Sequence, residues 1–211
     1  MEFIDYENWN RREHFEFFSK YDEPFFGLVT EVECTNAYKT AKSKKISFFA
    51  YYLYQSIKAA NQIEEFRYRI MDGKVACFKD IHAASTIGRP DGTFGFSFIH
   101  YSENFSTFEK DLNSEIQEVL NSKGLRANEN DARRDVIHYS TLPWNKFTGL
   151  THARNFNNGD SVPKISFGKA YVKDEKRYLP VSIDAHHGLV DGFHVAKYLG
   201  LFQELLEEGQ M

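Results

Sequence analysis

The 211-residue sequence predicts an α/β protein, specifically an α+β two-layer sandwich in which a large mixed β-sheet is flanked by helices. Runs of strand length, rich in aromatic and β-branched residues, occur toward both ends of the chain. Segments with apolar residues at helical spacing lie between and after them. Only about three or four such segments are found, which argues against the regular alternation of strands and helices in a doubly wound fold.

Local sequence signals place each element along the chain. Helices are predicted at residues 8–21, 48–63, 106–120 and 193–207. Strands are predicted at residues 26–34, 67–71, 74–78, 93–101, 136–141, 147–153, 163–172 and 177–187. Asn8, Ser47 and Ser106 are the expected helix caps, since their side-chain oxygens can accept from free N–H groups of the first turn. Asp72-Gly73 is the strongest hairpin signal.

Composition narrows the class of protein. Hydrophobic residues make up 42% of the chain, which supplies a core for one domain spanning residues 1–211. The net charge of -4 and the pI of about 6.1 argue against nucleic acid as a partner. Cys34 and Cys77 indicate no disulfide framework. The acidic N-terminus and the lack of a long apolar window predict a cytoplasmic protein with no membrane span.

The most informative segment is His186–Gly192, which reads HHGLVDG between a strand-like run and an amphipathic helix. Strand alternation places His187 on the same face as Val181, Ile183 and Ala185, and His186 on the other face. Partial desolvation among apolar residues favours a neutral imidazole, which accepts a proton near neutral pH. His187 is therefore a candidate general base.

Simpler interpretations of this segment stay open. A single histidine on an apolar face is more often structural than catalytic, and Asp-Gly is commonly only a turn. Asp191 also suits a helix cap. A metal site made of His186, His187 and Asp191 is not expected, because adjacent strand residues point apart and no third ligand has zinc-like spacing.

Three motifs together resemble the chloramphenicol acetyltransferase family. Residues 9–16 (WNRREHFE) match its W-x-R-[RK]-E-H-F-E signature, residues 142–147 match its PW segment, and HHGLVDGFHV matches its HHxxxDGFHV motif. These matches follow in order over nearly the whole chain. The resemblance implies the CoA-dependent acyltransferase fold of that family and a homotrimer with its sites between subunits.

The resemblance also assigns roles to individual residues. It places the general base of a direct acetyl transfer from acetyl-CoA to a hydroxyl, most simply one of chloramphenicol, on His187. The family's supporting ion pair falls on Asp191 and Arg11. It assigns contacts with coenzyme A to Lys45, Lys169 and Trp144. Either lysine taken alone would be interpreted as a solvated surface residue.

Several positions depart from the family pattern. Gly149 stands where the family has the serine that stabilises the oxyanion, and the neighbouring Thr148 is expected to face the other way. Ser166 replaces a threonine and keeps a hydroxyl, whereas Ala170 replaces a tyrosine. Loss of one oxyanion donor generally costs about 2.7–4 kcal/mol of transition-state stabilisation.

The acceptor pocket is the least determined part of the prediction. Phe18, Phe26, Phe94 and Phe96 are its expected aromatic walls, and the adjacent carboxylates at residues 22–23 favour a cationic or polyol acceptor if they face the pocket. Three alternatives to chloramphenicol acetylation therefore stay open. They are the same chemistry on another hydroxylated molecule, a degenerate ligand-binding homologue, and a dihydrolipoamide acyltransferase core, against which the His-His motif and the short chain argue.

Overall fold

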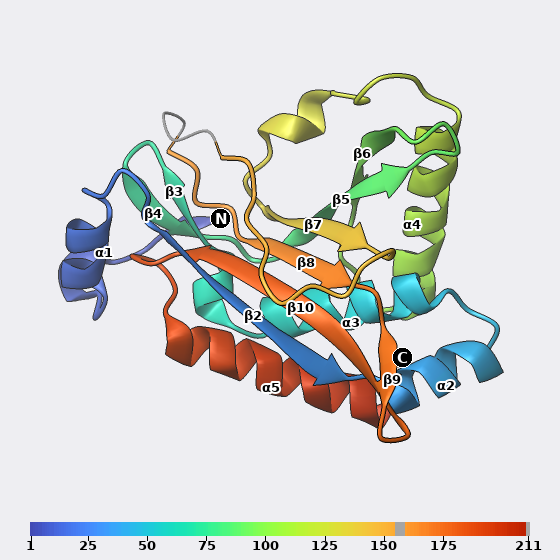
Figure 1. The fold of residues 1–211 in the computed structure, drawn as a ribbon. Coiled ribbons are helices and arrows are strands. Elements are labelled where there is room, and N and C mark those ends of the chain that lie inside the picture. The colour runs from blue at the N-terminus through green and yellow to red at the C-terminus, as the bar shows by residue number, and fades with distance from the viewer. Residues whose placement is uncertain (155–158, 210–211) are drawn as a thin grey trace.

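The computed structural model describes residues 1–154 and 159–209, and it contains a seven-stranded sheet with the long helices on one face and long loops on the other (Figure 1). The described α-helices are α1 (Arg12–Phe18), α2 (Thr35–Ser43), α3 (Phe48–Asn61), α4 (Phe105–Leu120) and α5 (Gly192–Glu208). The strands are β1 (Glu2–Phe3), β2 (Phe25–Glu33), β3 (Tyr68–Met71), β4 (Lys74–Cys77), β5 (His82–Gly88), β6 (Phe94–Ile99), β7 (Val136–Leu142), β8 (Lys164–Gly168), β9 (Tyr171–Lys173) and β10 (Lys176–His186).

The large sheet is mixed, as predicted. Its strand order is β2-β10-β8-β7-β5-β6, and β9 pairs with the beginning of β10. The β5–β7 and β7–β8 pairs are parallel, and the other pairs are antiparallel. A small separate sheet has the order β1-β4-β3. The long antiparallel β2–β10 pair brings Phe25 beside His186, so it places the start of one strand beside the histidine motif.

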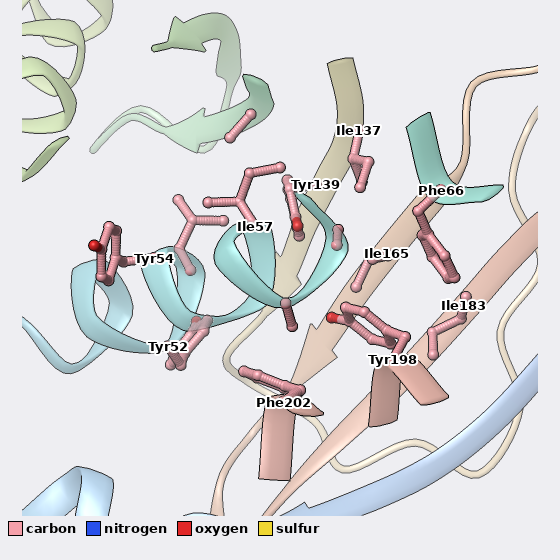
Figure 2. Close-up of a cluster of buried hydrophobic side chains, with 14 of the residues drawn as sticks. Tyr52, Tyr54, Ile57, Phe66, Ile137, Tyr139, Ile165, Ile183, Tyr198 and Phe202 are labelled. Carbon is pink, nitrogen blue, oxygen red and sulfur yellow. The ribbon is translucent and has the colours of Figure 1, made fainter. Parts of the chain in front are cut away.

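The core lies between the sheet and helices α3 and α5 (Figure 2). Ile165 of β8 and Ile183 of β10 point into it and are almost completely buried. The hydroxyl of Ser56 on α3 joins the hydroxyls of Tyr139 on β7 (2.9 Å) and Tyr198 on α5 (2.6 Å). These bonds satisfy tyrosine oxygens that would otherwise be buried without a partner. The core therefore fixes both helices against the sheet.

Two of the three expected helix caps are wrong. Asn8 ends a 3-10 turn (Tyr6–Asn8), and α1 begins only after Arg11. Helix α4 is capped by Asn104, whose side-chain oxygen accepts from the N–H of Thr107 at 3.0 Å. The Ser47 cap of α3 is confirmed. Asn104 was overlooked because the capping-box pattern that begins two residues later fits the consensus equally well.

Other boundaries also differ from the prediction. Helix α2 was not predicted, so the described residues contain more α-helices than the three or four expected. Strand β5 was not predicted either. Residues 147–153 form no strand, and the single strand expected at 163–172 is divided into β8 and β9. The hairpin prediction is confirmed: Asp72 (φ 50°) and Gly73 (φ 76°) both adopt the left-handed conformation of a tight two-residue turn.

Candidate active site

The His-His motif forms a tight turn where β10 ends. The N–H of His187 donates to the carbonyl of Pro24 at 2.8 Å, so the turn is attached to the residue before β2. Gly188 suits this position, because a Cβ here would be in tight contact, 3.1 Å from both the His186 ring and the backbone of Phe15. The sequence therefore fixes the backbone that carries His187.

The two histidines have different environments. His186 is buried against Phe15 and Phe25, and its Nδ1 accepts from the N–H of Gly188 at 3.2 Å. Desolvation by burial lowers its pKa to about 4, so this ring is neutral. His186 is thus a structural residue that shapes the turn.

His187 contacts two aromatic rings. Its imidazole stacks on Phe18 with a centroid separation of 4.0 Å and an interplanar angle of 9°, and Phe26 lies 4.6 Å away on a tilted plane. Nδ1 of His187 is buried and has no hydrogen-bond partner in the described part of the chain. Nε2 is therefore the nitrogen through which this ring can reach a substrate, and the two rings restrict its orientation.

An ion pair fixes the other side of the turn. Nη1 of Arg11 lies 2.6 Å from Oδ2 of Asp191, and Nη2 of Arg11 donates to the carbonyl of His187 at 3.3 Å. Asp191 also caps α5, since Oδ1 accepts from the N–H groups of Phe193 and His194. Partial burial raises the pKa of this carboxyl, but the hydrogen bond from Arg11 and the charge of His194 outweigh it, and the pKa is lowered overall.

Sequence reasoning missed one member of this cluster. Nδ1 of His194 lies 2.8 Å from Oδ1 of Asp191, and its Nε2 lies 3.4 Å from Glu65. Glu65 belongs to a 3-10 helix (Glu64–Arg67), so the cluster also reaches the small sheet. The motif HHxxxDGFHV contained His194, but nothing in the sequence indicated Glu65 as its partner.

The predicted coenzyme A residues lie elsewhere in the fold. Trp144 is 75% exposed in the turn after β7, and the N–H of Lys169, just after β8, donates to the carbonyl of Asn145 at 2.9 Å. Lys45 is exposed in the turn between α2 and α3. Because β8 and β10 are antiparallel, the end of β8 lies at the opposite end of the sheet from His187. The structure thus brings Trp144 and Lys169 together and leaves Lys45 on a separate turn.

The predicted oxyanion residues are also separated. Thr148 and Gly149 are exposed in the loop that follows β7, and no atom lies within 4 Å of where a Cβ of Gly149 would be. Ser166 is completely buried, and its Oγ is 2.9 Å from Nε2 of His152. None of these three side chains contacts His187 within the described chain, so their roles stay predictions.

Ser166 belongs to a network that sequence reasoning missed. Nδ1 of His152 lies 3.0 Å from Oδ2 of Asp184, and Nη2 of Arg154 lies 2.9 Å from Oδ1 of Asp184. Gly27 leaves room for that carboxylate, because a Cβ there would lie 3.0 Å from it. The connectivity Ser–His–Asp is that of a hydrolase triad, but a fully buried serine cannot attack a substrate. The network instead attaches the loop before β8 to the sheet.

A cavity of about 570 Å³ lies on the loop-covered face of the sheet. Phe94 and Phe96 line it together with Phe98, whereas Phe18 and Phe26 do not. From β10 to β6 there are four strand spacings of about 4.8 Å each, or about 19 Å in all. The cavity also reaches Lys164 on β8, the neighbour of β10. One chain therefore divides the predicted aromatic walls: Phe18 and Phe26 lie beside His187, whereas Phe94 and Phe96 line the cavity about four strands away.

Two negative findings apply to the described residues alone. They contain no group of three or more His, Cys, Asp or Glu side chains that could hold a metal ion. No helix among them has the length and hydropathy needed to cross a membrane.

The sheet order, the covering helices and the anchored His-His turn define a protein with the CoA-dependent acyltransferase fold. Residues 1–203 match the family model "Chloramphenicol acetyltransferase", and the chain belongs to that family. The predicted family and fold are thereby confirmed.

Individual relatives agree over nearly their full length. A chloramphenicol acetyltransferase of Proteus mirabilis is 26% identical over 98% of this chain and 94% of its own. One of Clostridium perfringens is 28% identical over 98% of each chain. A solved structure named chloramphenicol acetyltransferase has a TM-score of 0.91 and 33% identity, and covers 98% of this chain and 100% of its own. A probable dihydrolipoamide acetyltransferase of Listeria monocytogenes (TM-score 0.67, 12% identity, 95% of this chain and 92% of its own) shares the fold.

We expect Asp191→Ala to destabilise the protein more than Asn104→Ala, which removes only the cap of α4. Loss of a cap typically costs about 0.5–2 kcal/mol, whereas Asp191→Ala also leaves Arg11 buried without its partner, for a total of about 3–5 kcal/mol. Urea unfolding followed by circular dichroism measures both values. Equal losses would show that the ion pair contributes nothing beyond the cap.

Asp191→Asn separates charge from capping and adds a pH dependence. The lowered pKa of Asp191 means that its ionised form stabilises the fold above the ordinary carboxyl pKa of 3.8, and that this contribution is lost as the pH falls through the folded value. The stability difference between wild type and Asp191→Asn should therefore shrink below pH 3.8.

Proposed function

We propose that the protein is an acetyl-CoA-dependent O-acetyltransferase in which His187 is the general base, with chloramphenicol as the reference acceptor. The observation that carries this proposal is the restrained imidazole of His187: Phe18 and Phe26 pack against its ring, Nδ1 is buried, and Nε2 is the nitrogen left to reach a substrate. Arg11 and Asp191 hold the turn that presents it. Membership of the family supplies the reaction class.

The proposed reaction is a direct transfer. Nε2 of His187 takes the proton of the acceptor hydroxyl while the hydroxyl oxygen attacks the thioester carbonyl. The tetrahedral intermediate then expels the thiolate of coenzyme A, which takes the proton from the imidazolium, so the base is regenerated without an acetyl-enzyme. A positioned base of this kind typically contributes about 10²–10⁴-fold to the rate.

The predicted coenzyme A residues suit that substrate chemically. Lys45 and Lys169 are exposed and have no carboxylate partner in the described part of the chain, so both ammonium groups are available to phosphates. The exposed indole of Trp144 next to Lys169 offers an apolar contact. We propose a cytoplasmic location, where acetyl-CoA is available.

We further propose that the active enzyme is a homotrimer in which His187 of one subunit faces the cavity of its neighbour. The separation of about 19 Å between strands β10 and β6 supports this assembly, because a small acceptor cannot contact both His187 and the aromatic rings of β6 within one chain. A ring of three heterologous interfaces would complete three equivalent sites. The expected particle has the mass of three 24.6-kDa chains.

A ligand-binding homologue without catalysis is the second candidate, and Gly149 favours it because the family's oxyanion hydroxyl is missing. The intact cluster of His187, Arg11 and Asp191 favours the enzyme. The two candidates differ in whether acetyl-CoA turns over.

His187→Ala should lower acetyl transfer to chloramphenicol by at least about 10²-fold, because the hydroxyl loses its proton acceptor. Thiol release from acetyl-CoA measures the rate, and light scattering shows whether the assembly is intact. His100→Ala is the matched control, since His100 is an exposed histidine at the end of β6. Near-normal activity of a correctly assembled His187→Ala variant would refute the assignment of the base.

Gly149→Ser should raise turnover, by up to about 10²-fold, if the missing hydroxyl limits stabilisation of the oxyanion. The side chain fits without strain, because the space around Gly149 is open. Gly149→Ala controls for the change in backbone freedom. An equal effect of Ser and Ala would remove the hydroxyl from the explanation.

Mixing two inactive variants tests the shared site. His187→Ala keeps the cavity, and Ala84→Trp fills the cavity but keeps His187. In randomly mixed 1:1 trimers, about one quarter of the interfaces join an intact cavity to an intact His187. Co-expression should therefore restore about a quarter of the activity, whereas a site within one chain would stay inactive.

A further inference from the structure

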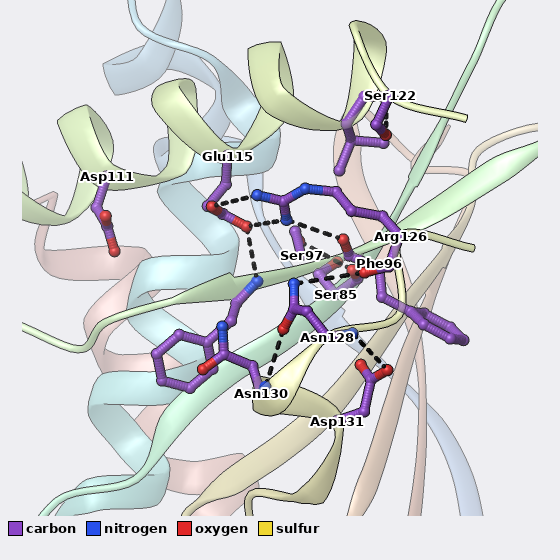
Figure 3. A network of polar contacts seen from close by, with 12 residues as sticks. Ser85, Phe96, Ser97, Asp111, Glu115, Ser122, Arg126, Asn128, Asn130 and Asp131 are labelled. Atoms are coloured by element: carbon purple, nitrogen blue, oxygen red, sulfur yellow. Dashed lines mark hydrogen bonds and ion pairs between the residues drawn. The ribbon is translucent and has the colours of Figure 1, made fainter. Parts of the chain in front are cut away.

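His194 lies at the start of α5 and takes part in capping that helix. Its Nδ1 accepts from the N–H of Asp191 at 3.2 Å, and this bond is one half of a capping box. Another capping box of this chain begins the 3-10 helix Glu129–Ala132, where the exposed carboxylate of Asp131 accepts from the N–H of Asn128 at 3.0 Å (Figure 3). Glu and Gln are the usual residues at this position. A histidine that is only 7% exposed therefore indicates a further role for the ring.

The other nitrogen of the ring faces a different part of the fold. Nε2 of His194 lies 3.4 Å from Oε1 of Glu65, in the 3-10 helix that precedes β3. Because Nδ1 accepts, a neutral ring carries its proton on Nε2, toward that carboxylate. Desolvation by burial lowers the pKa of His194 most, and the cations Arg11 and Lys197 lower it further. Glu65 and Asp191 raise the pKa without cancelling these effects, so the ring is neutral at neutral pH.

A neutral His194 leaves the charge of Asp191 to Arg11. Oδ1 of Asp191 lies only 2.8 Å from Nδ1 of the ring. An imidazolium would donate a proton to this oxygen and compete with Arg11 for the carboxylate, whereas the neutral ring bonds the backbone of Asp191 instead. Arg11 therefore remains the cation on Oδ2, at 2.6 Å, and its second nitrogen donates to the carbonyl of His187.

The turn that carries His187 is thus held at both ends by bonds to its backbone. Its start is attached to the residue before β2, because the N–H of His187 donates to the carbonyl of Pro24. Its end is attached to the ring of His194, because the N–H of Asp191 donates to Nδ1. Loss of the second bond would free the end of the turn while the first bond stays intact.

We infer that His194 is a positioning residue for the acetyl transfer, and that Glu65 holds its ring from the side opposite Asp191. This inference rests on the proposed function, since it concerns the placement of the same base. His194 acts through the turn, so its loss should lower kcat and leave the KM values of both substrates nearly unchanged. A misplacement of about 1 Å in a reacting group can cost about 10²-fold in rate.

Two variants separate hydrogen bonding from packing in a thiol-release assay with acetyl-CoA and chloramphenicol. His194→Phe keeps a buried ring and removes both nitrogens, so kcat should fall by about 10- to 100-fold. Both KM values should change by less than about twofold. His194→Gln loses the ring but returns an acceptor to the N–H of Asp191, as in an ordinary capping box, and should retain at least about a third of the wild-type kcat. An unchanged kcat in His194→Phe, or an equal loss in both variants, would overturn the inference.

Asn104→Ala is the matched control, because it removes a cap from another helix. It should lower the stability and leave kcat unchanged. If wild type releases no thiol, the proposed function fails. If wild type is active and His194→Phe is equally active, the inference is wrong while the proposed function holds.

Glu65→Ala tests the second contact without changing the buried position. It should lower kcat by about threefold or more, and it should have little further effect in His194→Phe, since the two residues act as one unit. Losses that multiply in the double variant would remove Glu65 from the inference. If light scattering shows that His194→Phe does not assemble, Glu65→Ala decides alone, and an unchanged kcat in it would overturn the inference.

Discussion

The pairing of Arg11 with Asp191 is the interaction on which the candidate active site depends. It connects the residue before α1 to the turn that carries His187 and to the first turn of α5, which follows that turn directly, although Arg11 and Asp191 are 180 positions apart in the sequence. Because Arg11 is almost fully buried, its charge requires that partner. The same carboxylate caps α5, so the helix that covers the sheet and the turn that presents the base share one anchor. Position of the base and stability of the fold are therefore linked.

The two faces of the large sheet have different roles. One face carries Ile165 and Ile183 against α3 and α5 and supplies most of the buried apolar surface. The other face is covered by loops, which cannot bury a wholly apolar surface without leaving their own backbone groups unpaired. Polar side chains on this face form hydrogen bonds with the covering loops, as His152 does with Asp184 and Ser166. A cavity remains between the loops and the strands.

The sequence predicted what is encoded locally. The alternation of apolar and polar residues and the turn residues predicted β2, β10 and the Asp72-Gly73 hairpin. The family motifs predicted the cluster of Arg11, His187 and Asp191. What it did not predict depends on pairing between distant segments. His152 and Asp184 are separated by 32 positions, and neither belongs to a recognisable pattern. The exposed cap at Asn104 competed with an equally good pattern at Ser106. Local signals of similar strength cannot be ranked without the tertiary contacts that decide between them.

The distance between the two halves of the site connects assembly to chemistry. The base at the end of β10 and the aromatic rings of β6 that line the cavity are held apart by the sheet, and no side-chain movement spans about 19 Å. A neighbouring subunit can bring them together without deforming either chain, because each half is already ordered: His187 by its aromatic rings, the cavity by its strands. The base and the selectivity of the cavity then lie on opposite sides of one interface. Substitutions in the cavity can accordingly change the acceptor while leaving the geometry of the base untouched.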